Sequence, residues 1–336
     1  MTSRNDEASG EDRLIARYFK PLATHPGALG LGDDAAFLRP PSGQDLVLTT
    51  DVLVAGVHFF ADDPPKTIAQ KAMRVNLSDL AAKGARPLGF LLTLGLQDAT
   101  NDRWLSDFAS GLKADIEAFD CPLFGGDTVR APVAMINVAM FGAVPEGSMV
   151  RRSGAKPGDR IFVTGTIGDA ALGLKVRRGE LDYLPADVRD FLLSRYWLPQ
   201  PRTSLAEALR RYASAAMDVS DGLIGDLAKL CDASGVAGQV DFTLFPRAHA
   251  TEIAFDDDRN LADDTLNLQN VAFTGGDDYE IVCTVSPERT EAFREAAKKA
   301  EVPVRAIGHI SAGKGLRVVD PLEIESTFSR RSFSHF

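Results

Sequence analysis

The stretch Met217-Asp218-Val219-Ser220-Asp221-Gly222-Leu223 is the part of the sequence that best indicates the fold. It places two carboxylates three residues apart, with a serine between them, where a run of small apolar residues ends. Residues 221–233 then carry apolar side chains at helical spacing, so we predict a strand-to-helix turn of the kind found in layered α/β domains. A helix N-cap accounts for one polar residue, but this stretch has three. We therefore interpret Asp218, Ser220 and Asp221 as candidate functional residues.

The same arrangement recurs along the chain. Four further stretches set aspartate beside glycine or hydroxyl residues, each next to an apolar run that we expect to be a strand or its flank: Gly32-Asp33-Asp34, Thr49-Thr50-Asp51, Gly126-Asp127-Thr128 and Gly275-Gly276-Asp277-Asp278. A helix predicted over residues 66–83 adds Asp79, on the same face as Asn76 and Lys83. Adjacent carboxylates repel one another unless a cation lies close to them. The recurrence therefore indicates a site that holds cations.

Carboxylates and hydroxyl groups are hard oxygen donors, and the acidic stretches contain no cluster of histidine or cysteine. Such donors suit Mg²⁺. Several Mg²⁺ ions in one site usually accompany phosphates, because the metal bridges phosphate oxygens and offsets the charge of phosphoryl transfer. The chain has neither a Walker A sequence nor a GxGxxG after a strand, which argues against P-loop and nicotinamide-binding folds. The sequence thus predicts a phosphate site with several Mg²⁺ ions.

Composition limits the class of protein. A length of 336 residues with 45% hydrophobic residues predicts two domains with sizeable cores. The net charge of −10 argues against a general nucleic-acid binder. The three cysteines are far apart, which argues against a disulfide framework or a zinc site. We find no signal peptide and no apolar run of about 18 residues, so we expect a soluble, cytoplasmic protein without a membrane partner.

Three further positions are candidates for binding. His58 follows the Thr49–Asp51 stretch and is a candidate substrate contact. Arg152 lies in a basic, glycine-bearing loop and is a candidate phosphate clamp. The glycine-rich turn over residues 166–171 opens a predicted helix and could hold phosphate at its N-terminus. A turn at residues 145–147 predicts the domain boundary.

Taken together and in order, the motifs resemble those of bacterial thiamine-monophosphate kinases from about residue 12 to residue 310. They read GDDAAF (32–37), TTDVLVAGVHF (49–59), NLSDLAAKGA (76–85), GGDTVR (125–130), RSGAKPGD (152–159), TGTIGDAALGL (164–174), MDVSDGL (217–223) and GGDDYE (275–280). The wider superfamily also contains aminoimidazole-ribotide synthetase and selenophosphate synthetase.

The resemblance implies an α/β (α+β) protein with the two-domain aminoimidazole-ribotide synthetase-like fold. It implies a disordered tail over residues 1–10, an N-terminal domain over 11–147 that binds ATP and Mg²⁺, and a C-terminal α/β domain over 148–336 that completes the active site. The N-terminal domain would form a β-barrel across a homodimer, with ATP and several Mg²⁺ ions in a cleft between the domains. The reaction would transfer the γ-phosphoryl group of ATP directly to thiamine monophosphate, the last step of thiamine diphosphate biosynthesis.

The resemblance also implies roles for single residues. The implied metal ligands are Asp34, Thr49, Thr50, Asp51, Asp79, Asp127, Asp218 and Asp221, of which Asp51, Asp127 and Asp218 would be catalytic. The implied ATP contacts are Gly126, Asp127, Arg152 and Ser220. The implied substrate contacts are His58, Asp277 and one of the aromatic residues Phe328 and Phe333. This chain departs from the family at Asp277, where a glutamate is usual, and in its C-terminal tail, where the family usually has a tryptophan.

Two alternatives remain open. One is a sister enzyme that uses ATP to activate an amide or selenide, although selenophosphate synthesis normally needs a reactive cysteine near the N-terminus and the first cysteine here is Cys121. The other is a non-catalytic protein that binds Mg²⁺ and a nucleotide. Degraded metal ligands would indicate the second alternative, and none of the six acidic sites is degraded.

Overall fold

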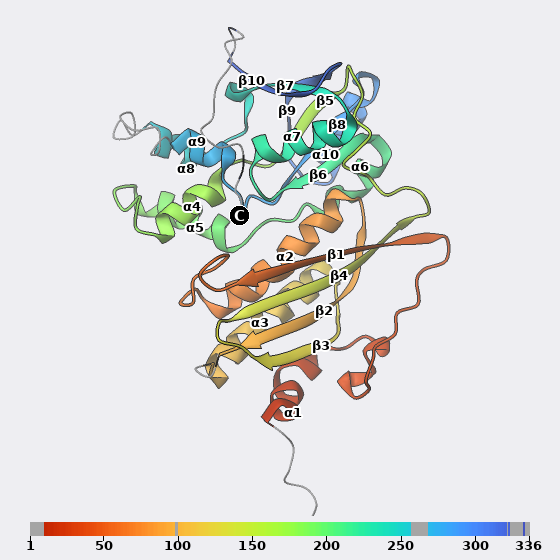
Figure 1. The fold of residues 1–336 in the computed structure, drawn as a ribbon, viewed down its shortest axis with the longest axis vertical. Helices are drawn as coiled ribbons and strands as arrows, with labels where there is room; N and C mark the ends of the chain where they lie inside the picture. Colours follow the sequence, from red (N-terminus) through yellow and green to blue (C-terminus); the bar gives the residue numbers. More distant parts are fainter. Residues whose placement is uncertain (1–9, 98–99, 257–267, 321, 323–331, 333–336) are drawn as a thin grey trace, which may run out of the picture. The chain divides into compact units, whose positions relative to one another are not determined.

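The computed structural model describes residues 10–97, 100–256, 268–320, 322 and 332. The chain forms two compact units. Unit 1 comprises Met1–Leu80 and Arg86–Glu146, and unit 2 comprises Ala81–Ala85 and Gly147–Phe336. Each unit is built around its own β-sheet (Figure 1). Residues 1–9 of the predicted tail lie outside the described residues, and Gly10 begins the short helix α1 (Gly10–Leu14).

Unit 1 contains an open four-stranded sheet in the order β1-β4-β2-β3. Its strands are β1 (Gln44–Val54), β2 (Arg86–Leu96), β3 (Leu123–Arg130) and β4 (Met135–Pro145). β4 pairs antiparallel with both β1 and β2, whereas β2 and β3 are parallel. β1 and β3 are therefore the two edge strands, and the described residues of one chain do not close a barrel.

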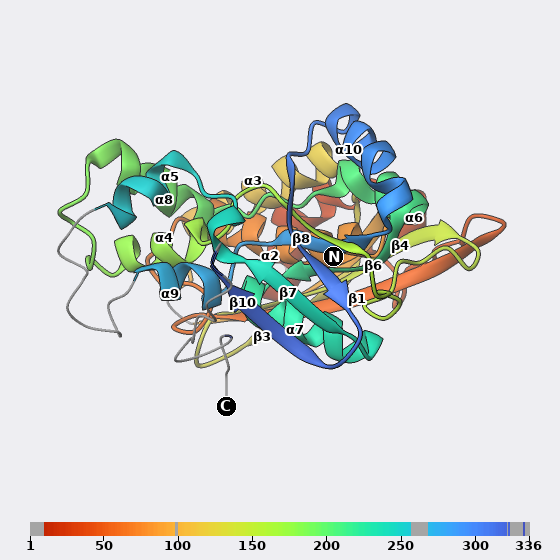
Figure 2. The same ribbon diagram turned by 90° about the horizontal axis from the view of Figure 1, so that it is seen from above.

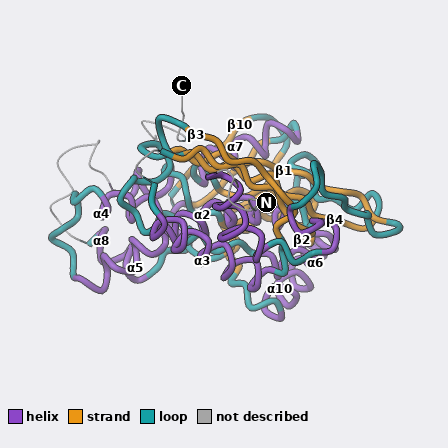
Figure 3. The backbone as a smooth tube through the Cα atoms, turned by 90° about the horizontal axis from the view of Figure 1, so that it is seen from below, coloured by secondary structure: helices purple, strands orange, loops and turns teal. Residues whose placement is uncertain are grey.

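Two helices, α2 (Pro65–Ala82) and α3 (Asp102–Phe119), cover one face of this sheet (Figure 3). Strand alternation sends Val47 and Leu53 of β1 into the core beneath them, whereas Leu48 on the opposite face is 71% exposed. The helices pack closely because Gly111 of α3 has no side chain: a Cβ there would lie 2.3 Å from the carbonyl oxygen of Lys66. The second face, which we call the open face, has no comparable helix layer among the described residues, although N-terminal residues such as Phe19 and Leu31 line a cavity on it.

Unit 2 contains a six-stranded sheet in the order β10-β7-β9-β5-β8-β6, in which only β10 and β7 are parallel. Its strands are β5 (Arg160–Thr164), β6 (Ala213–Val219), β7 (Ala237–Asp241), β8 (Glu280–Val285), β9 (Val304–Ser311) and β10 (Gly315–Val319). Its helices are α4 (Asp169–Arg177), α5 (Ala186–Trp197), α6 (Ala206–Tyr212), α7 (Leu223–Ser234), α8 (His249–Phe255), α9 (Leu268–Thr274) and α10 (Thr290–Lys299).

Both faces of this second sheet carry hydrophobic cores. Ile161 and Val163 of β5 point into the larger core, which also contains residues of α4, α5, α7, α8 and α9. Phe162, between them, points into the smaller core with residues of α6 and α10. Figure 2 shows α4, α5, α8 and α9 gathered at one end of the unit, apart from α6 and α10. The sheet is thus the middle of three layers.

Three short apolar segments differ from the sequence-based expectation. The apolar residues of the segment 239–245 predict a strand, but the observed strand β7 ends at Asp241 and the chain continues as a 3₁₀ turn, Phe242–Leu244. The apolar run 271–273 belongs to helix α9, and residues 35–38 form no strand. Short apolar runs carry too few residues to separate a period of 2 from one of 3.6, so these three predictions were wrong for the same reason.

Candidate functional site

Three of the predicted metal ligands lie on the helix-covered side of β1. The Thr49 hydroxyl donates a hydrogen bond to the Asp79 carboxylate of α2, and Asp51 follows two residues later on the same face of the strand. All three side chains are half-buried. One turn before Asp79, Asn76 is fully buried, and its Oδ1 atom has no hydrogen-bond partner among the described residues. These oxygen donors are of the type that Mg²⁺ prefers.

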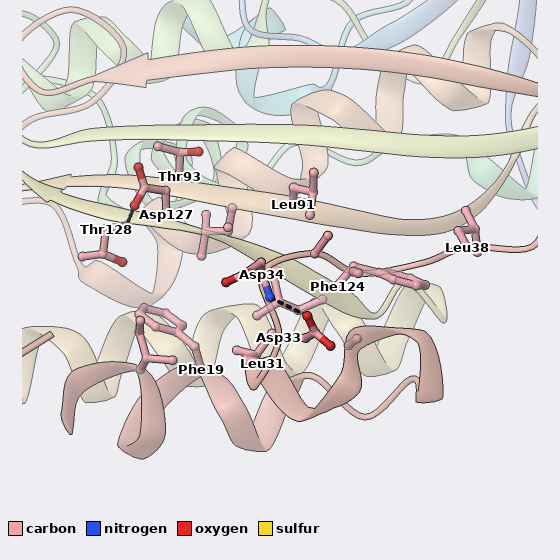
Figure 4. Close-up of a pocket in the computed structure, with 18 of the residues that line it drawn as sticks. Phe19, Leu31, Asp33, Asp34, Leu38, Leu91, Thr93, Phe124, Asp127 and Thr128 are labelled. Carbon is pink, nitrogen blue, oxygen red and sulfur yellow. Dashed lines mark hydrogen bonds between the residues drawn. The ribbon is translucent and has the colours of Figure 1, made fainter. Parts of the chain in front are cut away.

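A second group of acidic residues lies on the open face of the sheet, around a cavity of about 810 Å³ (Figure 4). Asp33 and Asp34 come from the loop after the 3₁₀ turn Pro26–Leu31, and Asp127 comes from β3. Asp34 donates its backbone N–H to Asp33 Oδ1 (2.8 Å), and Thr128 donates its backbone N–H to Asp127 Oδ1 (2.9 Å). The remaining wall is largely apolar, with Phe19, Leu91 and Phe124 among the lining residues.

Gly126 allows β3 to run close to β2 beside Asp127. A Cβ at position 126 would lie only 1.7 Å from the carbonyl oxygen of Leu92, whereas a Cβ at Gly125 would first meet Leu91 Cδ2 at 3.5 Å. The close approach of the two backbones therefore requires glycine before Asp127, whether or not a nucleotide binds there.

Thr50 lies on the same open face of the sheet, on the edge strand β1. Its hydroxyl donates to Asn137 Oδ1 (2.8 Å).

The fold separates the two groups. Asp51 lies on one edge strand and faces α2, whereas Asp127 lies on the other edge strand and faces the open side. Three strand spacings separate β1 from β3, which is about 14 Å. Among the described residues, no three histidine, cysteine, aspartate or glutamate side chains gather closely enough to hold a metal ion. The donor types suit Mg²⁺. Within one chain, however, the fold of unit 1 keeps Asp34 and Asp127 apart from Asp51 and Asp79.

His58 is held in place by the backbone. Its Nδ1 atom accepts a hydrogen bond from the backbone N–H of Val54 (3.0 Å), and its carbonyl oxygen accepts from Lys71 Nζ (3.2 Å). The imidazole orientation is therefore set by the turn that follows β1. The predicted aromatic substrate contacts Phe328 and Phe333 lie outside the described residues.

In unit 2 the fold places two of the motifs side by side. Asp277 donates its backbone N–H to the Ser220 carbonyl oxygen, and Tyr279 donates to the Val219 carbonyl oxygen, each at 2.9 Å. The loops touch so closely that a Cβ on Gly276 would lie 2.3 Å from the Ser220 oxygen. The MDVSDGL and GGDDYE segments thus form one structure. Asp218 at its base is only 7% exposed.

Asp221 already has a cationic partner. Lys229 of α7 contacts Asp221 Oδ2 at 2.6 Å and Asp226 Oδ1 at 2.8 Å, and the fully buried Asp226 also accepts the backbone N–H of Asp221 (2.9 Å). Burial raises the pKa of Asp226, although Lys229 opposes the rise. A metal ion at Asp221 would therefore compete with an ammonium group. Sequence reasoning missed Lys229, whose signal is its position three residues after Asp226 on a predicted helix.

Asp278, beside the predicted substrate residue Asp277, has a structural role. Its carboxylate is 2% exposed and accepts the backbone N–H groups of Gly168 (2.8 Å) and Ala170 (3.3 Å) at the start of α4. Burial, with Asp169 nearby, raises the pKa of Asp278 well above its usual value. The expectation that residues 166–171 hold phosphate is therefore wrong, because a carboxylate of the chain itself already occupies that helix N-terminus.

The loop that carries Arg152 is tied to the end of α7. The backbone N–H groups of Gly154 and Ala155 donate to Ser234 Oγ at 3.1 and 3.2 Å. Arg152 itself is exposed. An exposed guanidinium on an anchored loop is suited to bidentate contact with a phosphate.

Among helices built from described residues, none has the length and hydropathy needed to cross a membrane.

Comparison with known proteins gives the family of both units. The domain described as "AIR synthase related protein, N-terminal domain" matches residues 32–144, and the corresponding C-terminal domain matches residues 156–321. A thiamine-monophosphate kinase of Caulobacter vibrioides is 43% identical over 304 residues, which cover 90% of this chain and 84% of the relative. The Escherichia coli K12 thiamine-monophosphate kinase is 40% identical over 98% of this chain and 99% of its own length.

Solved structures agree with the sequence relatives. The crystal structure of thiamine-monophosphate kinase from Stenotrophomonas maltophilia K279a superposes with a TM-score of 0.80 at 37% identity, covering 91% of this chain and 94% of that one. The structure described as AaThiL complexed with AMPPCP and TMP has a TM-score of 0.77 at 29% identity and covers 91% of both chains. The fold is therefore shared with proteins of known structure.

Proposed function

The chain belongs to the thiamine-monophosphate kinase family, and we infer that it catalyses the ATP-dependent phosphorylation of thiamine monophosphate to thiamine diphosphate. The observation that carries this inference is the extent of the match. The motifs from Asp33 to Asp127 lie in the first matched domain, and those from Asp218 to Asp277 lie in the second. The relative complexed with AMPPCP and TMP supports the same pair of substrates.

The reaction joins two anions, so charge neutralisation and alignment supply most of the catalysis. When bound, Mg²⁺ offsets the charge on the phosphates. We propose that Asp51 and Asp79 of unit 1 would hold it, with Thr49 fixing the Asp79 carboxylate by its hydrogen bond. Asp34 and Asp127 on the open face of the unit 1 sheet, and Asp218 in unit 2, are further carboxylates that we propose as metal ligands. The acceptor phosphate is already ionised, so no side chain needs to act as a general base. Arg152 and Ser220 would contact ATP, and His58 and Asp277 the substrate.

We further propose that the protein acts as a homodimer through the open face of the unit 1 sheet. Leu48 (71% exposed), Leu46, Val52 and Leu91 expose apolar surface there. Within the described part of one chain, the edge strands β1 and β3 each pair on one side only. Exposed apolar patches and free strand edges usually mark an interaction surface. A second copy placed face to face would cover the patch and could complete the barrel that the family resemblance implies.

An activity assay tests the proposed function. The protein is incubated with ATP, Mg²⁺ and thiamine monophosphate, and thiamine diphosphate is followed for the wild type, Asp51→Asn and Asp232→Asn. We expect wild-type turnover that a chelator abolishes, and a loss of about 10²–10³-fold in kcat/KM for Asp51→Asn. Asp232 is an exposed residue of α7, so Asp232→Asn should match the wild type. ATP consumption with a different acceptor only would indicate a sister enzyme, and nucleotide binding without turnover would indicate a binding protein.

A further inference from the structure

The loop between α9 and β8, together with the first residue of β8, alternates between half-buried and buried residues. Asp277 and Tyr279 have left-handed backbone conformations, with φ of 76° and 49°. Asp278, which lies between them, is 2% exposed, and Glu280, which follows Tyr279, is fully buried. A left-handed conformation costs a non-glycine residue about 1–2 kcal/mol. Two such residues within three positions persist only because the surrounding structure holds them.

Asp278 is the first anchor. Its two carboxylate oxygens accept from Gly168 and Ala170, so the loop is fixed to the first turn of α4. Gly168 suits this contact because it is left-handed (φ 91°) and because a Cβ there would lie 2.3 Å from the Cβ of Ala272. A side chain with both oxygens directed at backbone amides inside the unit does not reach a substrate. Its effect on a substrate is therefore indirect.

Glu280 is the second anchor, and its contacts come from three elements. Arg202 donates to both carboxylate oxygens, from Nε to Oε2 (2.6 Å) and from Nη2 to Oε1 (2.5 Å). Arg195 of α5 donates to Oε1 (3.0 Å), and the Thr164 hydroxyl of β5 donates to Oε2 (2.6 Å). A bidentate arginine pair fixes direction as well as distance. Glu280 therefore determines the point at which the loop enters β8.

We propose that Asp278 and Glu280 are positioning residues that hold Asp277 toward the substrate and thereby set the affinity for thiamine monophosphate. This inference rests on the proposed function, in which Asp277 contacts the substrate. The buried carboxylates form two fixed points, one on either side of Tyr279. Asp277 directly precedes the first fixed point, and its own backbone N–H donates to the Ser220 carbonyl oxygen, so the backbone presents Asp277 in only one direction.

A double-mutant cycle tests the proposal. Asp277→Ala, Asp278→Ala and the double variant are compared for kcat, for KM of each substrate and for stability to urea. We expect Asp278→Ala to raise KM for thiamine monophosphate about tenfold and to leave KM for ATP within about twofold of the wild type. Because Asp278 acts through Asp277, the double variant should be no worse than Asp277→Ala alone. Glu280→Gln should show the same selective rise in KM.

Controls separate positioning from general destabilisation. Asp115→Asn removes an equally buried carboxylate from its ion pair with Arg74 in unit 1, so it should lower stability without changing KM for thiamine monophosphate. If Asp278→Ala does not fold, Asp278→Asn replaces it, since Asn keeps one carbonyl acceptor. Additive effects in the double variant, or equal rises in both KM values, would overturn the proposal. A wild type that does not turn over thiamine monophosphate would instead refute the proposed function.

Discussion

Asp277 and Asp278 are neighbours in the sequence but have opposite surroundings. Asp278 is buried against the first amides of α4, whereas Asp277 lies on a left-handed backbone (φ 76°) beside Ser220. Backbone strain at a non-glycine residue commonly marks a functional site, because the side chain must then contribute something other than stability. At the scale of single residues, we therefore expect function and stability to separate at position 277.

Asp277→Gly and Asp277→Ala form a matched pair that tests this separation. Both remove the carboxylate, but only alanine keeps the Cβ that disfavours a left-handed backbone. We expect the two variants to raise KM for thiamine monophosphate equally. We also expect Asp277→Gly to be more stable to urea than Asp277→Ala, by about 1 kcal/mol in the free energy of unfolding. Equal stabilities would show that position 277 is not strained. An unchanged KM in both variants would remove Asp277 from the substrate site.

At the scale of elements, periodicity predicted the longer helices and strands. The amphipathic pattern of residues 102–119 predicts a helix, which is observed as α3 with the same bounds. The apolar residues of the segment 46–54 predict a strand, which is observed as β1 and begins two residues earlier. The run 271–273 was misassigned because three apolar residues show no period. The roles of Arg195 and Arg202 had no local signal, since their partner Glu280 lies more than seventy positions away in the sequence.

The pairing of β2 with β3 gives a prediction at this scale. Gly126→Ala places a Cβ 1.7 Å from the Leu92 carbonyl oxygen, so the edge strand that carries Asp127 must move. We expect a loss of about 3 kcal/mol in the free energy of unfolding, together with reduced activity. Gly125→Ala, with its nearest atom at 3.5 Å, should stay within about 0.5 kcal/mol of the wild type. Urea denaturation of both variants checks the difference, and equal stabilities would argue against the close approach of the two strands.

At the scale of the whole molecule, the sequence could not predict which acidic stretches meet. Five similar motifs suggested one shared site, and the motifs around Ser220 and Asp277 do lie side by side. The sheet order β1-β4-β2-β3 instead places Asp51 and Asp127 on opposite edges. Strand order depends on pairing between distant segments, and the local pattern of side chains carries no information about that pairing. If both carboxylates serve one active site, a second chain must bring them together.

Mixed dimers test this arrangement directly. Asp51→Asn and Asp127→Asn chains are given different affinity tags, and the heterodimer is purified by using both tags in turn. If each active site combines Asp51 of one chain with the partner subunit's Asp127, one of the two sites in the heterodimer carries both substitutions and the other carries neither. We then expect about half of the wild-type activity per dimer, although each parent variant is nearly inactive. If both carboxylates of a site come from the same chain, every site has one substitution and no activity returns. Sedimentation of the purified species verifies that dimers are being compared, and a wild type that sediments as a monomer would contradict the homodimer itself.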